Sequence, residues 1–434
     1  MSVIRLSVLL SLLMMLSAPA RALDAVEQAI AEAVVRNNDD ALAVLEESVN
    51  INSGTMNFDG VRAVGDLFAR EFQALGFTTQ WIDGAAFGRA GHLTARRGDS
   101  GPRLLLIGHL DTVFATDSPF QSYEALPDDR ARGPGTTDMK GGNVVMLQAL
   151  RALLESDRLD SIQVRVVLTG DEEHRGRPLE LANAALVDAA KWADVALGFE
   201  DGDGNPATAV VARRSAGSWR LQVTGKPAHS SQIFRDDIGY GAIFETARIL
   251  DQWREALAEE DYLTFNPGII LGGTELDHDV PAARGSAFGK NNVIPQTVAV
   301  SGGIRAISQE QLNRAIATMQ TIAEDNLAHT TSEFTYSASY PPMAPRPANR
   351  ELLALYDRGS RDLGHGAVTA VDPRRAGEAV ISFAADHVDM ALDGLGLMGE
   401  GGHTVDEVAD LGTLVSQAQR AALLMHRLSL KAGN

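Results

Sequence analysis

Residues 104–111 are Leu-Leu-Leu-Ile-Gly-His-Leu-Asp, an apolar run that ends in two polar side chains, His109 and Asp111. A short apolar run of this kind predicts a buried strand over residues 104–107. The surrounding sequence predicts a second strand at residues 164–168 and helices at residues 144–154 and within 25–77, with Gly76 as a stop. Strands that alternate with helices indicate an α/β fold with a largely parallel sheet.

The pattern changes near residue 213, where apolar and polar residues begin to alternate as in half-exposed strands. Strands are expected at 219–223, 268–274, 293–305 and 333–340, and helices at 238–257 and 309–327. This order predicts a small α+β domain. After the Pro-rich residues 341–347, the first pattern resumes through 352–363, 389–397 and 410–428. We therefore expect a larger domain in two parts, 23–212 and 341–434, with an inserted domain at 213–340.

The composition excludes several classes of protein. With 434 residues, 45% hydrophobic and 22% charged, the chain is too apolar for a disordered protein or a coiled coil. Its net charge of −19 opposes binding to a phosphate backbone, so no nucleic-acid partner is expected. Because there is no cysteine, a metal ion would be held by His, Asp and Glu alone.

Residues 1–22 resemble a secretory signal peptide, with Arg5 before an apolar stretch at 6–16 and Ala20-Arg21-Ala22 at the end. The apolar stretch is about half as long as a membrane-spanning helix requires. A retained membrane anchor is the alternative. We expect an exported protein, periplasmic or secreted, that has no membrane partner.

Polar side chains follow the predicted strands. His109 and Asp111 would share a face, so Asp111 could accept the imidazole N–H when His109 binds a metal; a hydrogen-bonded strand-end histidine is the alternative. In Gly133-Pro-Gly-Thr-Thr-Asp-Met-Lys-Gly-Gly142, Asp138 precedes a helix, where it could bridge two cations or simply cap the helix. The stretch lacks the Gly-Lys-Ser/Thr of a P-loop.

Further acids and a histidine add to this set. Adjacent Glu172 and Glu173 repel each other unless a cation is near, so one could bind a metal while the other accepts a proton from water; a solvated acidic turn is the alternative. Either Glu200 or Asp201 could be a ligand, and His403 lies among glycines in a loop where it could also be merely exposed. Because an α/β sheet binds ligands at the carboxyl ends of its strands, these side chains together favour two zinc ions, with Co²⁺ or Mn²⁺ as other possible ions.

The ordered motifs His-x-Asp, Gly-x-Gly-x-x-Asp-x-Lys-Gly-Gly, Asp-Glu-Glu, Glu and a late glycine-flanked His resemble those of co-catalytic zinc metallopeptidases. That family includes bacterial glutamate carboxypeptidase, acetylornithine deacetylase, succinyl-diaminopimelate desuccinylase and aminoacylase, and the resemblance extends over nearly the whole chain after residue 22. It implies a mostly parallel sheet flanked by helices, with an inserted α+β lid that usually dimerises. It also implies that Asp138 bridges two zinc ions. The remaining roles implied are His109 and Glu200 on one ion, Glu173 and His403 on the other, Glu172 as general base, and Asp111 orienting His109.

The resemblance extends to the lid. His229 in Gly-Lys-Pro-Ala-His-Ser matches a histidine that stabilises the oxyanion, often from the partner subunit, and Asn292 and Arg305 match residues that hold a substrate carboxylate. A surface role for His229 and an ion pair for Arg305 are the alternatives. Two departures concern specificity: residues 276–291 are longer than expected, and Arg374-Arg-Ala-Gly-Glu-Ala379 replaces Gly-Gly-x-x-Asp. Arg305, Arg374 and Arg375 suggest the hypothesis that an acidic side chain is accepted.

The sequence thus predicts a homodimeric zinc exopeptidase or amidohydrolase that cleaves the amide next to a free C-terminal carboxylate, in a small peptide or an N-acyl amino acid. Glu at position 200 resembles the carboxypeptidase and acylase branches. The alternatives are an N-acyl-amino-acid deacylase and a non-catalytic peptide-binding protein. A dehydrogenase is excluded because no Gly-x-Gly-x-x-Gly follows the first strand.

Overall fold

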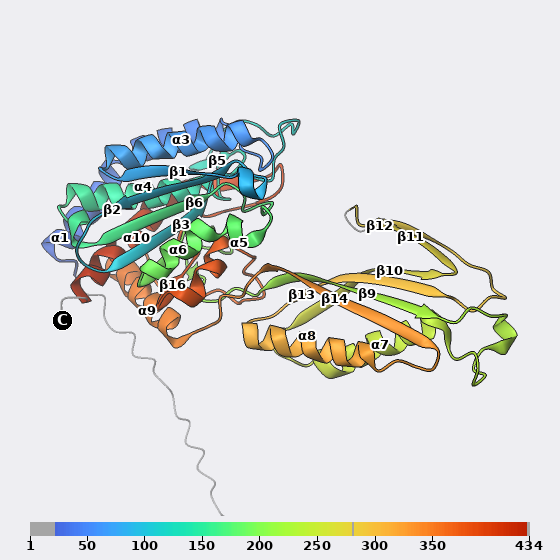
Figure 1. The fold of residues 1–434 in the computed structure, drawn as a ribbon. Helices are drawn as coiled ribbons and strands as arrows, with labels where there is room; N and C mark the ends of the chain where they lie inside the picture. Colours follow the sequence, from blue (N-terminus) through green and yellow to red (C-terminus); the bar gives the residue numbers. More distant parts are fainter. Residues whose placement is uncertain (1–21, 280–281, 432–434) are drawn as a thin grey trace, which may run out of the picture.

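The computed structural model describes residues 22–279 and 282–431, so the predicted signal peptide, except for its last residue, lies outside the described part. Figure 1 shows two layered bodies, one built around a six-stranded sheet and one around a longer four-stranded sheet. No helix within the described ranges has the length and hydropathy needed to cross a membrane.

The six-stranded sheet has the order β1-β2-β6-β3-β7-β16. Its strands are β1 (Thr78–Asp83), β2 (Gly91–Arg97), β6 (Gln163–Thr169), β3 (Arg103–His109), β7 (Val195–Gly198) and β16 (Met390–Leu392). Strands β6, β3, β7 and β16 are parallel to one another, whereas β2 pairs antiparallel with both β1 and β6. The expected α/β class is therefore correct, with an antiparallel hairpin added at one edge.

Both faces of this sheet are buried. Along β3, Leu104 and Leu106 belong to one apolar core, while Leu105 and Ile107 belong to a second core on the opposite face. The helices around the sheet are α1 (Ala25–Arg36), α2 (Asn38–Val49), α3 (Phe58–Ala74), α4 (Lys140–Glu155), α5 (Leu179–Ala182), α6 (Ala184–Trp192), α9 (Pro347–Asp362) and α10 (Gly412–Lys431). Helices α1, α2, α4 and α10 pack on one another, and α6 contacts β3 and β6.

Short strands complete this body. One small sheet has the order β17-β18-β5-β4, formed by β17 (Gly399–Glu400), β18 (Val408–Asp410), β5 (Arg130–Arg132) and β4 (Glu124–Leu126). A second pairs β8 (Thr208–Ala209) with β15 (Thr369–Ala370) in parallel. These sheets join segments that lie far apart in the sequence, including the loops that carry Asp138 and His403.

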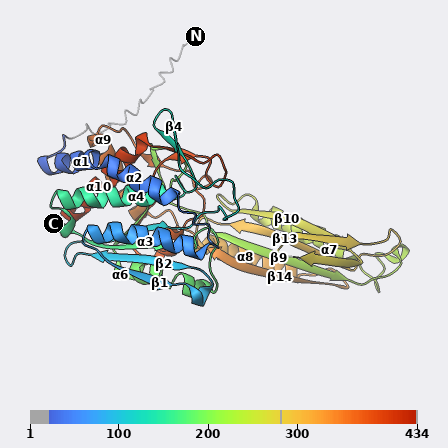
Figure 2. The same ribbon diagram turned by 90° about the horizontal axis from the view of Figure 1, so that it is seen from above.

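The four-stranded sheet is antiparallel, in the order β10-β13-β9-β14. Its strands are β10 (Thr264–Gly273), β13 (Thr297–Arg305), β9 (Ala216–Gly225) and β14 (Thr330–Tyr340). Helices α7 (Gly241–Leu257) and α8 (Gln309–Glu324) cover one face, and Trp219 and Trp253 meet there edge to face in a separate core. Figure 2 shows this body, which we call the lid, extending away from the larger one.

The long stretch at 276–291 contains a hairpin that the sequence did not predict. β11 (Glu275–Asp279) pairs antiparallel with β12 (Arg284–Phe288). Its side chains are mostly exposed and polar, so the stretch carries little of the hydrophobic pattern by which strands are predicted.

Candidate metal centre

The residues that end or follow three parallel strands lie at one edge of the large sheet. His109 is the last residue of β3, Glu172 and Glu173 follow β6, and Glu200 follows β7. Two loops bring the remaining groups to the same edge, because Asp138 precedes α4 and His403 lies between β17 and β18. The carboxyl edge of a parallel sheet is where an α/β protein places its ligands.

Asp138 stands between two groups of side chains. Its Oδ1 lies 3.0 Å from Nε2 of His109, which is also 3.6 Å from Oε1 of Glu200. Its Oδ2 lies 2.8 Å from Nε2 of His403, which is also 3.3 Å from Oε2 of Glu173. The two oxygens of one carboxylate thus face two separate sets of ligand atoms, each gathered within 4.8 Å. Asp138 makes no helix cap, since the N-cap of α4 is Met139 and has no side-chain capping bond.

The cluster concentrates acids that resist ionisation. Burial raises the pKa of Glu172 to about 8 and that of Glu173 to about 7, and it raises the pKa of Glu200 well above its usual range. Burial alone would also raise the pKa of Asp138, but hydrogen bonds with His109 and His403 hold it below its ordinary value.

Both histidines of the cluster bind protons tightly for the same reason. Hydrogen bonds to Asp138 and Glu173 raise the pKa of His403 to about 11. Burial opposes the charged form of His109, yet the nearby Glu200 and the bonds to Asp111 and Asp138 hold its pKa well above the usual value. Without a cation, protons supply the positive charge that so many carboxylates require.

The donor set fits divalent metal ions. Oε1 of Glu173 is buried and has no hydrogen-bond partner among the described residues, as expected for an oxygen that binds a metal ion. Imidazole nitrogens and carboxylate oxygens suit zinc, cobalt and manganese. His109, Asp138 and Glu200 form one candidate set, and Asp138, Glu173 and His403 form another. A third group, His109, Glu172 and Glu173, does not include Asp138. Of the two acids that the sequence left open, Glu200 belongs to a set, whereas Asp201 only lines the adjoining cavity.

The neighbours of the cluster hold it in place. Nδ1 of His109 is 2.9 Å from the backbone oxygen of Asp111 and 3.5 Å from its carboxylate. That carboxylate is buried and accepts hydrogen bonds from the Thr55 hydroxyl at 2.7 Å and from the backbone N–H groups of Glu172 and Glu173. Asp111 therefore orients His109 mainly through its backbone, while its side chain fixes the turn that carries the two glutamates.

Glu407 is a supporting residue that the sequence did not reveal. It is fully buried and its carboxylate accepts hydrogen bonds from the N–H groups of Gly135, Thr137 and Asp138, at 3.1, 2.9 and 3.2 Å. These bonds tie the turn before α4 to the segment that leads into β18. The positions of Asp138 and His403 are thereby linked.

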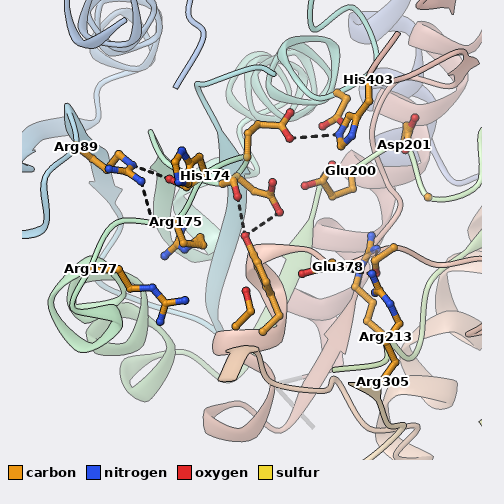
Figure 3. A pocket seen from close by; sticks show the side chains of 17 residues that line it. Arg89, His174, Arg175, Arg177, Glu200, Asp201, Arg213, Arg305, Glu378 and His403 are labelled. Carbon is orange, nitrogen blue, oxygen red and sulfur yellow. Dashed lines mark hydrogen bonds and ion pairs between the residues drawn. The ribbon is translucent and has the colours of Figure 1, made fainter. Parts of the chain in front are cut away.

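A cavity of about 680 Å³ opens beside the cluster (Figure 3). Its wall includes Glu172, Glu173, Glu200, His403 and, from the last position of β14, Tyr340. The Tyr340 hydroxyl donates to the backbone oxygen of Glu172 at 2.8 Å and lies 3.2 Å from Oε1 of the same residue. This tyrosine joins the lid to the glutamate that is expected to act as the base.

The predicted lid residues are separated in the structure. Arg305 lines the cavity, where its Nη2 lies 2.9 Å from Oε1 of Glu378, so it forms the ion pair that the sequence left as an alternative. His229 and Asn292 do not line this cavity but lie next to each other in the lid. The Ser230 N–H donates to the Asn292 backbone oxygen, and the backbones of His229 and Val293 form an isolated antiparallel β-bridge.

The hypothesis that Arg374 and Arg375 bind an acidic side chain in this cavity is not supported. Arg375 pairs with Asp203 at 3.2 Å, and Arg374 lies over the ring of Tyr262, so neither lines the cavity. Four arginines that the sequence did not single out line it instead: Arg89, Arg175, Arg177 and Arg213. A single arginine among polar residues belongs to no sequence pattern that would identify it as part of a binding site.

Comparisons with known proteins agree with this geometry. The sequence pattern described as "Peptidase family M20/M25/M40" matches residues 105–428. Carboxypeptidase G2 of Pseudomonas sp. (strain RS-16) is 25% identical over 399 residues, covering 90% of this chain and 89% of that protein. Aminopeptidase PepT of Bacillus cereus superimposes with a TM-score of 0.70 at 18% identity, over 90% of this chain and 99% of that chain.

A third protein is similar in fold. The YXEP protein of Bacillus subtilis, described as a dinuclear metal binding peptidase, has a TM-score of 0.62 at 14% identity, over 92% of this chain and 99% of that chain. The family match includes every residue of the candidate metal sets. The chain therefore belongs to peptidase family M20/M25/M40 and is a metal-dependent hydrolase.

Proposed function

We propose that this protein is an exported zinc exopeptidase that cleaves the amide bond next to a free C-terminal carboxylate. The observation that carries the proposal is Asp138, whose two oxygens face His109 with Glu200 on one side and His403 with Glu173 on the other. When bound, a pair of zinc ions supplies the Lewis acidity that activates water and polarises the scissile carbonyl.

Glu172 is the residue proposed to move the proton. It lies in the cavity wall beside Glu173, and it belongs to neither of the two sets that share Asp138, so its carboxylate is available to exchange a proton. Glu172 would accept a proton from the attacking water and deliver it to the leaving nitrogen. Tyr340, which donates to Glu172, would hold the carboxylate in the orientation needed for both transfers.

Recognition of the free carboxylate is assigned to Arg305. A guanidinium group binds a carboxylate through two parallel hydrogen bonds. Arg305 lies in the wall of the cavity, where a substrate carboxylate can reach it. The pair with Glu378 is made through Nη2 of Arg305, so the other N–H groups of the guanidinium would bind the substrate carboxylate. The match to carboxypeptidase G2 over 90% of the chain supports this choice over other reactions of the family.

Export and a homodimer are part of the same proposal. The signal-like sequence of residues 1–22 supports export. The lid carries exposed large apolar side chains, including Phe234, Ile243, Phe244, Ile270 and Phe288, and the rings of Phe234 and Phe244 lie 5.5 Å apart. Exposed apolar clusters of this kind favour association, and in a dimer His229 and Asn292 would act on the partner's cavity.

The test uses N-blocked dipeptides and their C-terminal amides. The mature chain is stripped with a chelator, reloaded with zinc and assayed on both. We expect hydrolysis only of the free acids and only after metal is restored. Equal cleavage of the amides would contradict the exopeptidase proposal, and cleavage of N-acyl amino acids without cleavage of dipeptides would identify a deacylase instead.

A further inference from the structure

A second cavity adjoins the one beside the metal cluster. It has a volume of about 480 Å³ and lies at the end of the lid sheet nearest the larger body, where all four lid strands contribute to its wall. Four residues line both cavities: Arg177, Arg305, Ser339 and Glu378. A substrate held at the metal cluster therefore has space to extend toward the lid, past these four residues.

The charges at this junction do not cancel. Arg305 and Glu378 neutralise each other through their ion pair, which leaves the guanidinium of Arg177 as the uncompensated charge in the wall of the second cavity. Within the described residues, the Arg177 side chain has no hydrogen bond and no carboxylate partner, and Figure 3 shows it directed into the cavity. The junction therefore attracts an anion at Arg177.

The backbone that carries Arg177 is held firmly even though its side chain is free. The Arg177 N–H donates to the backbone oxygen of Phe87 at 3.0 Å, and the Gly176 N–H donates to the carboxylate of Asp171 at 2.9 Å. Asp171 is fully buried and also accepts a hydrogen bond from the buried Arg175. A fixed backbone reduces the entropy lost when the side chain binds a ligand.

Gly176 shows how closely this loop is packed. A Cβ atom added there would lie 2.6 Å from both the ring and the backbone oxygen of Phe87.

Arg89, on the neighbouring loop, donates its guanidinium N–H groups to the backbone oxygens of Gly88, His174 and Arg175. No carboxylate of residues 22–279 or 282–431 pairs with Arg89, so Arg89 adds to the positive potential of the wall.

We propose that Arg177 binds a second carboxylate of the substrate, on the side chain of the residue whose α-carboxylate is held by Arg305. This inference rests on the proposed function, and it assigns recognition of the acidic side chain to a residue of the larger body rather than of the lid. The expected substrates are amides of an acidic amino acid, which the enzyme distinguishes from amides of the neutral isostere because guanidinium binds carboxylate more strongly than carboxamide.

The test compares two N-blocked dipeptides, N-benzoyl-glycyl-L-glutamate and N-benzoyl-glycyl-L-glutamine, on the zinc-loaded full-length mature chain. We expect the unmodified enzyme to favour the glutamate by kcat/KM, and Arg177→Met to reduce kcat/KM for the glutamate by about 10- to 100-fold while changing it for the glutamine by less than about twofold. Arg177→Lys should retain part of the preference, since it keeps the charge but loses the planar donor pair. Arg350→Met, which removes an exposed arginine of α9 outside both cavities, is the matched control and should change neither rate.

Four results would overturn the inference. An equal loss on both substrates would show that Arg177 supports the fold or the metal cluster, and no loss on either would show that the guanidinium is merely solvated. Hydrolysis of both substrates by the unmodified enzyme without a preference would contradict the inference alone. Absence of hydrolysis of these substrates and of every other N-blocked dipeptide would contradict the proposed function, and the inference with it.

Discussion

The hydroxyl of Tyr340 donates to the backbone oxygen of Glu172 at 2.8 Å and reaches Oε1 of the same residue at 3.2 Å. Tyr340 is the last residue of the final lid strand, and its ring lies 5.2 Å from that of Phe383 in the larger body. The chain thus leaves the lid beside the proposed general base. A displacement of the lid that moved Tyr340 would also change the surroundings of Glu172.

Removing this hydroxyl should slow catalysis without weakening substrate binding. We expect Tyr340→Phe to reduce kcat by about 10-fold, the value of one hydrogen bond to a charged group, with KM and metal content unchanged. Tyr336→Phe is the control, because Tyr336 is on the same strand and its hydroxyl has no hydrogen bond within the described part of the chain. A rise in KM with an unchanged kcat would place Tyr340 in substrate binding instead.

Glu172 and Glu173 are adjacent, yet their proposed roles differ and so should the effects of their removal. Glu172→Gln should keep its metal and lose about 10²- to 10⁴-fold in kcat, because a carboxamide cannot accept the proton. Glu173→Gln should lower metal content, since Oε2 of Glu173 is part of the set with Asp138 and His403. Metal analysis of both variants by mass spectrometry, alongside kcat, separates the roles. Metal loss in Glu172→Gln would assign a ligand role to that residue.

The sequence could predict part of the cluster because His109, the two adjacent glutamates and Glu200 end or follow strongly hydrophobic strands, whereas Asp138 and His403 lie in loops. The run at 104–107 marks a strand buried on both faces, and parallel pairing with its neighbours brings the residues at the carboxyl ends of these strands to one edge. The strands at the edge of the sheet were harder to predict from the sequence. Residues 78–83 are Thr-Thr-Gln-Trp-Ile-Asp, with a half-exposed pattern, and they become β1 only through pairing with β2. Tertiary pairing decided a segment that its own sequence left open.

The supporting residues could not be predicted for a different reason. Glu407 accepts hydrogen bonds from N–H groups some 270 positions earlier in the chain, and Tyr340 donates to Glu172, which lies 168 positions away. A single sequence shows no sign of such long-range hydrogen bonds. Arg374 and Arg375 illustrate the converse, because their adjacency suggested a binding site, but the fold directs them to Tyr262 and Asp203.

A buried ion pair next to Glu200, whose N–H donates to Oδ1 of Asp393 at 3.4 Å, should contribute strongly to stability. Nε of Arg213 lies 2.8 Å from Oδ2 of Asp393, and both side chains are almost fully buried. We expect Asp393→Asn to lower the free energy of unfolding by about 3–5 kcal/mol, because it leaves a buried guanidinium unpaired.

The exposed pair Arg62–Asp66, with a similar N–O distance of 2.9 Å, provides the control. Asp66→Asn should cost less than about 1 kcal/mol. Urea denaturation of the metal-loaded proteins measures both changes. Equal small losses would mean that water or another group compensates Arg213 in the variant.

Metal removal should destabilise the protein more at pH 8 than at pH 5. In the metal-free site the pKa of Glu173 is about 7 and that of Glu172 about 8, both above the ordinary value of 4.5. The folded state then binds more protons than the unfolded state between these values. Its free energy of unfolding falls as the pH rises from about 4.5 to 8, since the protons that offset the carboxylate charges are lost.

Divalent ions replace those protons, so their stabilising effect should grow over the same pH range. The measurement is the difference in Tm between zinc-loaded and chelator-treated protein at pH 5, 6.5 and 8, which cancels titrating groups that the metal does not touch. Glu173→Gln should flatten this dependence, because it removes both a raised pKa and a ligand. A Tm difference that stays constant or shrinks toward pH 8 would mean that protons and metal ions do not compete for these carboxylates, and that the ions are held elsewhere.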